Sequence, residues 1–400
     1  MTLKPITLAC MGLFAVPAVA LAQSTVEIYG TLNADLESVK AEGGSGTNFS
    51  SRSRVTSNSS NIGFRGTEEL SPGFGAFFQV ESSVNIDSGT SSGFWASRNS
   101  GVGLLSKNYG RVLLGQWDSP YKFSTLRFDP TGDTGIAGYS GILGSTGTIT
   151  AGQGGNNFAE RASFSRRVSN VVQYWTPSWR GLSGRLAYGV SDTNIGSPST
   201  GVPEGSGLKP SLFAGAAMYE DGPLYATLAY EQHDDFQALN TLLAAPVSKG
   251  KDHAWKAGVQ YGFLDNTLTF GAIFERLQYK ADDINGLGSL ERKIDNWYVV
   301  GAYQLGAHGF ALSYGQKGKE KLSGAGFSDL PDSRARQVSA RYGYTLSKRT
   351  QLYAVATRIS NDSNAFQEFG NSPITSTTLF RDPARGADPV GVGIGMIHKF

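Results

Sequence analysis

The sequence predicts an all-β protein, a transmembrane antiparallel β-barrel of about sixteen strands. Three observations support this: hydrophobicity alternates with a period of two, tight turn signals recur at regular intervals, and no segment after residue 22 is apolar enough for a membrane-spanning helix. The composition agrees. The 400 residues include 52 Gly, 22 Phe and 17 Tyr, and the charged fraction of 17% is low against about 25% in typical soluble domains.

The N-terminal 22 residues have the layout of a secretory signal peptide. Lys4 supplies one positive charge, residues 6–16 are apolar, and a small-residue site ends at Ala22. A membrane anchor is the alternative, but Pro17 interrupts the segment, which is shorter than the roughly 20 apolar residues that span a bilayer. We therefore expect cleavage after residue 22 and an exported domain over residues 23–400.

Cleavage also removes Cys10, the only cysteine, so the exported chain cannot form a disulfide, bind zinc through thiolates or use a cysteine nucleophile. The whole sequence has a net charge of +2, and the loss of Lys4 leaves +1. This near-neutral balance gives no reason to expect a nucleic-acid partner.

Seven short turn signals set the strand count. They are Ser71-Pro72-Gly73, Asn108-Tyr109-Gly110, Pro177 to Gly181, Asp221-Gly222, Asp265-Asn266, Gly306 to Gly309 and Ser347 to Thr350. Most are about 40 residues apart, enough for two strands and a polar loop, so seven turns with both chain ends on one side give about sixteen strands. One interval is about 70 residues, which predicts a third external loop with roughly 30 extra residues. We place this loop at residues 118–165.

Between the turns, strand faces separate by polarity. Val26, Ile28, Leu32 and Leu36 share one face, while Glu27, Asn33, Asp35 and Glu37 share the other. A soluble sandwich or propeller would also alternate, but its strands run about 5 to 6 residues, whereas these run nearer 10, enough to cross a bilayer with tilt. Aromatic residues at strand ends, such as Phe263 and Tyr344, fit the girdles of a membrane barrel.

Several segments of the mature chain are similar to the general porins of Gram-negative outer membranes, in their β-proteobacterial branch. They are Val26 to Gly30, Ile62 to Leu70, Phe74 to Glu81, Gly110 to Gln116, Arg167 to Tyr174 and Gly395 to Phe400. The terminal Phe400 resembles the signature that the outer-membrane insertion machinery reads in this family. The alternative is a last strand that ends on an aromatic residue of the girdle.

The resemblance implies a homotrimer in the cell outer membrane, reached through the periplasm and embedded in lipid and lipopolysaccharide. It also implies that the third external loop folds into the lumen and forms a constriction. Acidic residues on that loop would face basic residues on the opposite wall. Such charge arrangements govern selectivity because the pore is narrow and bordered by low-dielectric protein.

The candidate constriction residues follow from this resemblance and from strand parity. Arg98 and Arg167 match basic wall positions of the family. Arg167 should face the lumen if Val172 and Tyr174 face lipid, and Arg65, opposite in parity to Phe64, should also face inward. The candidate loop acids are Asp118, Asp129, Asp133 and Glu160. Where relatives often carry arginine, this chain has Asn61 and Gln116, which predicts a thinner basic ladder.

The functional hypothesis is a water-filled channel for passive diffusion of small hydrophilic solutes and ions. The alternatives are a substrate-selective porin for a sugar or an anion, a surface ligand-binding barrel, and a lipid hydrolase. Trp117, Tyr121, Phe123 and Phe128 would form a stacking track in a sugar porin, or pack the loop against the wall. The four histidines lie in separate strands or loops and none sits in a recognisable nucleophile motif such as G-x-S-x-G, so we expect neither an enzyme nor a cofactor or metal.

Overall fold

The structure, a computed structural model, describes residues 25–45, 48–89, 95–132, 134–144, 164–190, 209–236, 238–239, 249–284, 286–370, 372–374 and 385–400. The predicted signal peptide therefore lies outside the described residues. So do Asp133 and Glu160, two of the four candidate loop acids.

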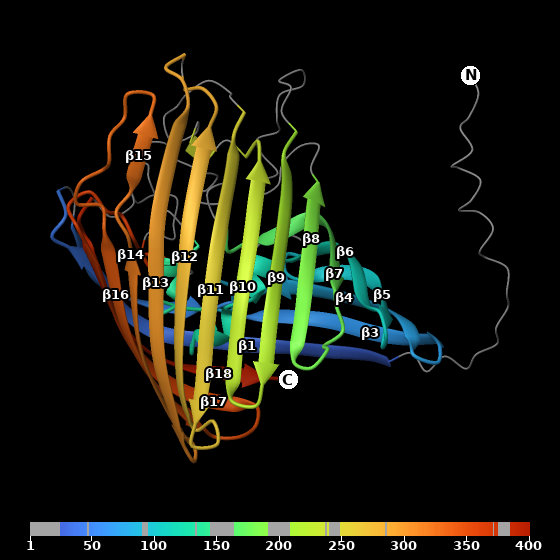
Figure 1. The fold of residues 1–400 in the computed structure, drawn as a ribbon. Coiled ribbons are helices and arrows are strands. Elements are labelled where there is room, and N and C mark those ends of the chain that lie inside the picture. Colours follow the sequence, from blue (N-terminus) through green and yellow to red (C-terminus); the bar gives the residue numbers. More distant parts are fainter. Residues whose placement is uncertain are drawn as a thin grey trace, which may run out of the picture.

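Long strands dominate the described chain (Figure 1). They are β1 (Thr25–Glu42), β2 (Phe49–Ser57), β3 (Asn61–Ser71), β4 (Phe74–Ser83), β5 (Ser100–Ser106), β6 (Gly110–Asp118), β7 (Arg167–Trp175), β8 (Leu182–Val190), β9 (Ser211–Asp221), β10 (Leu224–Asp234), β11 (Lys251–Phe263), β12 (Leu268–Ala281), β13 (Leu290–Leu305), β14 (His308–Lys317), β15 (Lys321–Gly324), β16 (Ala335–Thr345), β17 (Thr350–Asn361) and β18 (Asp388–Lys399).

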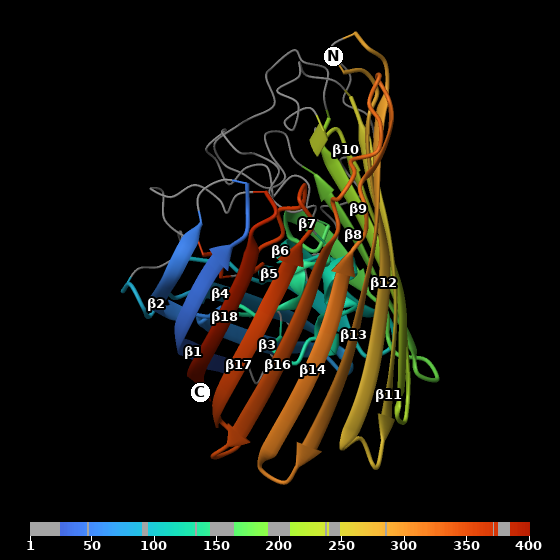
Figure 2. The same ribbon diagram turned by 90° about the vertical axis from the view of Figure 1, so that its left-hand side faces the viewer.

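These segments form a closed antiparallel ring of sixteen strands. β2 and β3 pair with successive parts of β1, so together they make one wall strand interrupted between residues 57 and 61. β14 and β15 likewise pair with successive parts of β13. The ring closes where β1 pairs with β18, from Thr31 opposite Lys399 to Glu42 opposite Asp388. Figure 2 shows β1, β18, β17, β16 and β14 side by side in this closing region. The predicted barrel and its strand number are confirmed.

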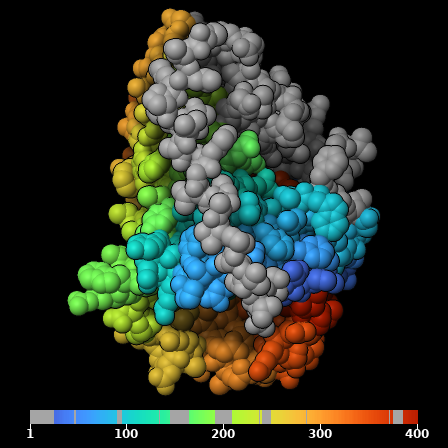
Figure 3. Space-filling model, turned by 90° about the vertical axis from the view of Figure 1, so that its right-hand side faces the viewer, coloured from blue at the N-terminus to red at the C-terminus, as the bar shows by residue number. Residues whose placement is uncertain are grey.

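All seven predicted turns connect neighbouring, paired strands. Gly222 adopts φ +54° in the turn between β9 and β10, a left-handed conformation that costs glycine little because it has no Cβ. The turn between β7 and β8 projects from the wall formed by β3 to β8, in green in Figure 3. Its Trp179 is 68% exposed, as expected for an aromatic residue at a membrane interface.

The polarity of the wall is inverted relative to a soluble protein. Large apolar side chains lie on its outer face, among them Ile28, Leu114, Leu228, Leu312 and Ile394. Charged and amide side chains on the alternate positions are buried inside, for example Glu37, Glu231 and Asn296. An apolar exterior around a polar interior is the arrangement that lipid outside and water inside favour.

The third external loop folds into the interior. It contains α1 (Pro120–Phe123), η2 (Leu126–Phe128) and η3 (Tyr139–Gly141), and Ser119 caps α1 by accepting a hydrogen bond from the Lys122 amide. No helix in the described parts of the chain is long and apolar enough to cross a membrane.

Contacts with the neighbouring strands β10 to β13 locate this loop against one side of the barrel. Phe128 is 1% exposed and its ring packs against Tyr225 of β10. A Cβ at Gly258 of β11 or Gly271 of β12 would lie 2.9 and 2.8 Å from the same ring, so glycine at these positions allows the close approach. Further along, Tyr139 packs on Tyr298 of β13. The predicted inward-folded third loop is therefore confirmed.

Candidate functional site

A buried carboxylate on β12 holds two separate parts of the loop against the wall. Glu275 is 0% exposed and accepts hydrogen bonds from the Tyr121 hydroxyl at 3.0 Å and from the Gly144 amide at 2.6 Å. Asn296 Nδ2 of β13 donates a third at 2.9 Å. Burial raises the pKa of Tyr121 well above its ordinary value, and the neighbouring Glu275 adds to this shift. Tyr121 therefore remains a neutral hydrogen-bond donor.

Lys256 of β11 completes this anchor. Its Nζ lies 3.7 Å from Glu275 Oε2, donates to Thr125 Oγ1 at 3.3 Å and to Ser165 Oγ at 3.0 Å, and sits 3.9 Å from the centre of the Tyr121 ring. Because the lysine and the glutamate are both buried, each compensates the charge of the other. The anchor places the start of the loop at a fixed depth in the lumen.

Arg98 belongs to a small polar cluster with Glu81 of β4 and Tyr29 of β1. Its Nε donates to Glu81 Oε1 at 2.5 Å, and the Tyr29 hydroxyl donates to Glu81 Oε2 at 2.9 Å. The guanidinium and the carboxylate are 22% and 12% exposed. Arg98 is thus an ion-paired cation in a region that water still reaches.

Arg167 and Asp118 are direct partners, since they stand opposite each other at the ends of β7 and β6. Arg167 Nη2 lies 3.3 Å from Asp118 Oδ1, and Lys122 Nζ approaches the same oxygen at 3.2 Å. Asn99 links the pair, accepting from Arg167 Nε at 2.8 Å and donating to Asp118 Oδ2 at 2.9 Å. Asp118 therefore belongs to the wall on the same side as Arg167, with two cations on one buried carboxylate.

The strict alternation expected along β7 is wrong at its start. Asn170 has φ +50°, and the register against β6 shifts between Gly115 and Trp117. This β-bulge brings Val168, together with Val171, into the interior cluster around Trp117. Residues 167 and 169 therefore do not share the face of residues 171 and 173. Arg167 is located by its contacts with Asn99 and Asp118 instead of by parity.

Gln116, one of the two positions where relatives often carry arginine, supports this bulge. Its Nε2 donates to the carbonyls of Ala96 and Arg98 at 3.2 Å, and its Oε1 accepts from Ser169 Oγ at 2.8 Å. Asn61, the other such position, donates from Nδ2 to the Ser59 carbonyl. Neither amide contributes charge.

Asp129 is a structural residue of the loop. It is 5% exposed, and its carboxylate accepts hydrogen bonds from the amide and hydroxyl of Thr131 and from the Tyr139 amide, at 2.6 to 2.7 Å. These bonds fix the chain between η2 and η3. Of the acids expected to face the basic wall, Asp129 is hydrogen-bonded within its own loop and lies in electrostatic range of Arg341 of β16, and Asp118 is part of the wall.

Arg65 faces the same side as Glu27, Tyr29 and Gln79, its neighbours in the sheet. Two hydrogen bonds join its guanidinium to Glu27, at 2.8 and 3.0 Å, and the Arg65 and Glu27 side chains are 51% and 57% exposed. The pair lies away from the loop anchor. Its free energy contribution is small because water screens it.

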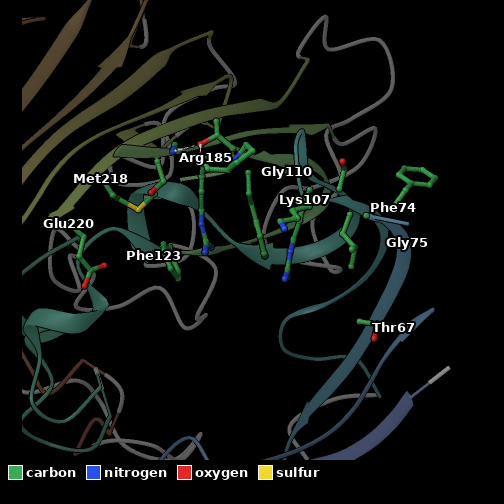
Figure 4. Close-up of a pocket in the computed structure, with 18 of the residues that line it drawn as sticks. Thr67, Phe74, Gly75, Lys107, Gly110, Phe123, Arg185, Met218 and Glu220 are labelled. Carbon is green, nitrogen blue, oxygen red and sulfur yellow. Dashed lines mark hydrogen bonds between the residues drawn. The ribbon is translucent and has the colours of Figure 1, made fainter. Parts of the chain in front are cut away.

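Two arginines that the sequence analysis did not single out line the open part of the lumen. A cavity of about 940 Å³ lies between β3–β6, β7–β10 and the loop. Arg111 borders it, and so does Arg185, which Figure 4 labels. Parity could have found them, because Val112, Leu114 and Leu186 face outward. The aromatic rings that contact these two arginines could not be predicted from the sequence.

The loop aromatics divide between packing and lining. Tyr121 and Phe128 are buried to 0% and 1%, and Trp117 is 8% exposed. These three pack the loop and the wall together and do not form a stacking track for sugars. Phe123 borders the cavity beside Arg185.

The terminal Phe400 completes the wall. Its amide and carbonyl exchange two backbone hydrogen bonds of 3.1 Å with Gly30. A Cβ at Gly30 would lie 2.5 Å from the Phe400 ring, so glycine leaves room for the aromatic ring where the barrel closes. Phe400 therefore extends the pairing between β1 and β18 where the barrel closes.

A closed wall with an apolar exterior, a polar interior and a loop folded beside an open cavity defines a transmembrane channel. In the described residues, no group of three or more His, Cys, Asp or Glu is arranged to hold a metal ion. Comparison with known proteins gives the same class. The family described as Gram-negative porin matches residues 7–364, and the chain belongs to that family. It is a porin of the cell outer membrane, a channel for small hydrophilic solutes.

Individual relatives agree. The chain is similar to outer membrane porin protein 32 of Delftia acidovorans, 26% identical over 98% of this chain and 99% of that protein. It is also similar to major outer membrane protein P.IB of Neisseria lactamica, 28% identical over 98% and 99% of the two chains. These relatives confirm the β-proteobacterial resemblance.

Solved structures share the fold. The anion-selective porin from Comamonas acidovorans superimposes with a TM-score of 0.73 at 22% identity, over 94% of this chain and all of that one. The trimer form of OmpT of Vibrio cholerae gives 0.60 at 14% identity, over 94% and 99%.

Proposed function

We propose that this porin acts by passive diffusion alone and favours small anions over cations. The observation that carries the proposal is the charge of the cavity lining. Among the described residues, no carboxylate pairs with Arg111 or Arg185, whereas Glu81 and Asp118 are held by Arg98, Arg167 and Lys122. Unpaired guanidinium groups in a narrow, low-dielectric passage raise the local concentration of anions.

Other charges around the cavity do not reverse this balance. Arg127 of the loop is paired with Glu220 at 3.0 Å. Glu68 and Glu69 border the cavity near the turn at residues 72–73, where both are exposed, and with Glu220 they face the four cations of the lining, Lys107, Arg111, Arg127 and Arg185. Salt screens such exposed charges over about 10 Å at 0.1 M. The selectivity of the solved Comamonas porin, named as anion-selective, points in the same direction.

The test is the zero-current potential across a planar bilayer with a KCl gradient. Wild-type channels should show a chloride preference that weakens in concentrated salt. Arg111→Gln with Arg185→Gln should shift the potential toward potassium, and Arg336→Gln, which removes an exposed arginine paired with Asp362, is the matched control. A cation preference in the wild type contradicts the proposal.

Arg98 and Arg167 remain proposed contributors to the constriction. Arg98→Gln with Arg167→Gln leaves Glu81 without its cation and Asp118 with Lys122 alone, so it should also shift the potential toward potassium at low salt. An unchanged potential at low salt removes both arginines from the selectivity site. The acidic partner across the pore stays a prediction for Asp133 and Glu160.

We also propose a homotrimer, exported with cleavage after residue 22 and inserted through recognition of Phe400 into a membrane with lipopolysaccharide. The trimer form of the Vibrio cholerae structure supports the assembly. Unboiled detergent extracts should migrate as trimers on a native gel, and a monomer-sized band with intact β-sheet circular dichroism contradicts this. N-terminal sequencing of the exported protein should read from Gln23.

A further inference from the structure

The cavity has a side chain whose geometry is more specific than a general positive field requires. Arg185 of β8 lies between two aromatic rings: its Cζ is 3.2 Å from the centre of the Phe123 ring and 4.1 Å from the centre of the Trp175 ring. One ring comes from the loop and the other from β7. Figure 4 shows Arg185 and Phe123 on one side of the cavity and Lys107 on the other.

Close contact with two rings restricts the rotation of this guanidinium. An arginine stacked in this way keeps its N–H donors at the edge of the plane, in the fork that matches a carboxylate. The described residues offer Arg185 no ion pair and no side-chain hydrogen bond. Its edge is therefore pre-organised for a ligand, since the side-chain entropy that a mobile arginine loses on binding is already lost.

A second cation stands on the same tryptophan. Arg111 Cζ lies 5.7 Å from the Trp175 ring and 5.6 Å from the Phe77 ring. Two like charges beside one ring repel each other, and an anion between them relieves that repulsion. The indole also has a fixed position, because its Nε1 donates to Gln173 Oε1 at 3.0 Å.

Apolar side chains share the cavity lining with these arginines. Leu105, Leu126, Phe123 and Met218 border the same cavity as Arg185. A ligand that fits this surface has a planar anionic group and an apolar body, since burial of apolar area adds about 25 cal/mol per Å² to binding. Inorganic anions lack the second feature, and neutral sugars lack the first.

We propose that Arg185, held between Phe123 and Trp175 and assisted by Arg111, forms a binding subsite for small carboxylates that carry an aromatic or apolar body. This inference rests on the proposed anion-conducting function. The carboxylate binds the edge of the guanidinium, and the apolar body lies against the loop and the wall near the short turns. Such solutes then bind at one position in the lumen, and their flux saturates at low concentration.

The experiment is a planar-bilayer recording of the full mature channel in KCl, with benzoate added on the side of the short turns. Benzoate should reduce chloride current at a concentration about tenfold lower than acetate does, because acetate lacks the ring. Benzamide, which keeps the ring and loses the charge, should have no effect at the same concentration. Sulfate, an anion without an apolar body, tests the alternative that any anion reduces the chloride current equally well.

Variants separate the subsite from the overall field. Arg185→Lys keeps the positive charge but loses the planar fork and the stacking, so benzoate should lose most of its advantage over acetate. Trp175→Leu should do the same through loss of the stacking surface. The matched control is Arg341→Gln, an arginine on the lumen side of β16 that stacks on Tyr353, outside the cavity lining. It should leave the benzoate-to-acetate ratio as in the wild type.

Each outcome decides one claim. Equal potency of benzoate, acetate and sulfate overturns the subsite but not the channel, and so does an Arg185→Lys channel with wild-type benzoate affinity. If Arg341→Gln and Arg185→Lys lower the benzoate-to-acetate ratio equally, the effect comes from the overall positive charge of the lumen, and this also overturns the subsite. A wild-type channel without anion preference in KCl alone overturns the proposed function, before any benzoate is added.

Discussion

Replacing the buried Lys256 with methionine should release the inward-folded loop from the wall. Lys256 is 1% exposed and its partner Glu275 is 0% exposed. Methionine keeps the length and volume of the side chain but removes the charge. Glu275 would then be a buried carboxylate that has lost its cation, although it keeps hydrogen bonds from Tyr121, Gly144 and Asn296.

The size of the effect follows from the geometry. Two unit charges 3.7 Å apart attract by about 4 kcal/mol at an effective dielectric constant of about 20, which agrees with the 3–5 kcal/mol typical of breaking one side of a buried pair. A loss of about 4 kcal/mol in the free energy of loop docking changes the undocked population by roughly a thousandfold. The lost hydrogen bonds to Thr125 and Ser165 act in the same direction.

The assay is hydrogen exchange of the Gly144 amide, because this amide donates directly to Glu275. Its exchange in the folded channel should accelerate by two to three powers of ten, about the factor above, and single-channel current noise should rise. In the double variant Lys256→Met with Glu275→Gln, Gly144 exchange should accelerate less, because no charge stays buried and glutamine still accepts hydrogen bonds.

The matched control is Lys317→Met. This lysine is equally buried but pairs with Glu320, away from the loop. It should leave Gly144 exchange unchanged. An unaltered exchange rate in Lys256→Met would show that the aromatic contacts alone hold the loop.

Two further predictions concern the outer end and the closure of the barrel. Burial raises the pKa of Glu320, but Arg292 and Lys317 outweigh it and hold that pKa below its usual value. The carboxylate therefore stabilises the fold above about pH 4.5, the unfolded value, and this contribution is lost as the pH falls through the lower folded value. The melting temperature, followed by circular dichroism, should fall in acid. Glu320→Gln should melt at a lower temperature than the wild type at pH 7, and its melting temperature should change less as the pH falls. Identical pH profiles of the two proteins contradict the assignment. At the closure, Gly30→Val should reduce refolding yield, read as the heat-modifiable band on a gel, because a side chain there meets the Phe400 ring and the Asn61 carbonyl at 2.5 and 2.6 Å. Ala34→Val on the same strand should refold normally, and equal yields for the two variants contradict the steric argument.

The sequence by itself determined the barrel. Alternation such as that from Val26 to Glu37 reports which solvent each side chain meets, and this is a local property of a strand. Turn signals such as Asp221-Gly222 are equally local, so they gave the strand number and every short connection. The length of one interval gave the third loop. Family motifs such as Gly110 to Gln116 then supplied the channel class.

Only the tertiary structure decided how the charges are paired. Asp118 and Arg167 are far apart in the chain, and their contact depends on the register of β6 against β7 and on the bulge at Asn170. A bulge adds one residue without changing the composition, so parity alone misplaces whatever lies beyond it. The loop has no hydrophobic period, so neither the Glu275 anchor nor the inward turn of Asp129 could be predicted. The stacking of Phe123 from this loop on Arg185 of the wall likewise exists only because the barrel closes around the loop and brings distant segments of the chain together.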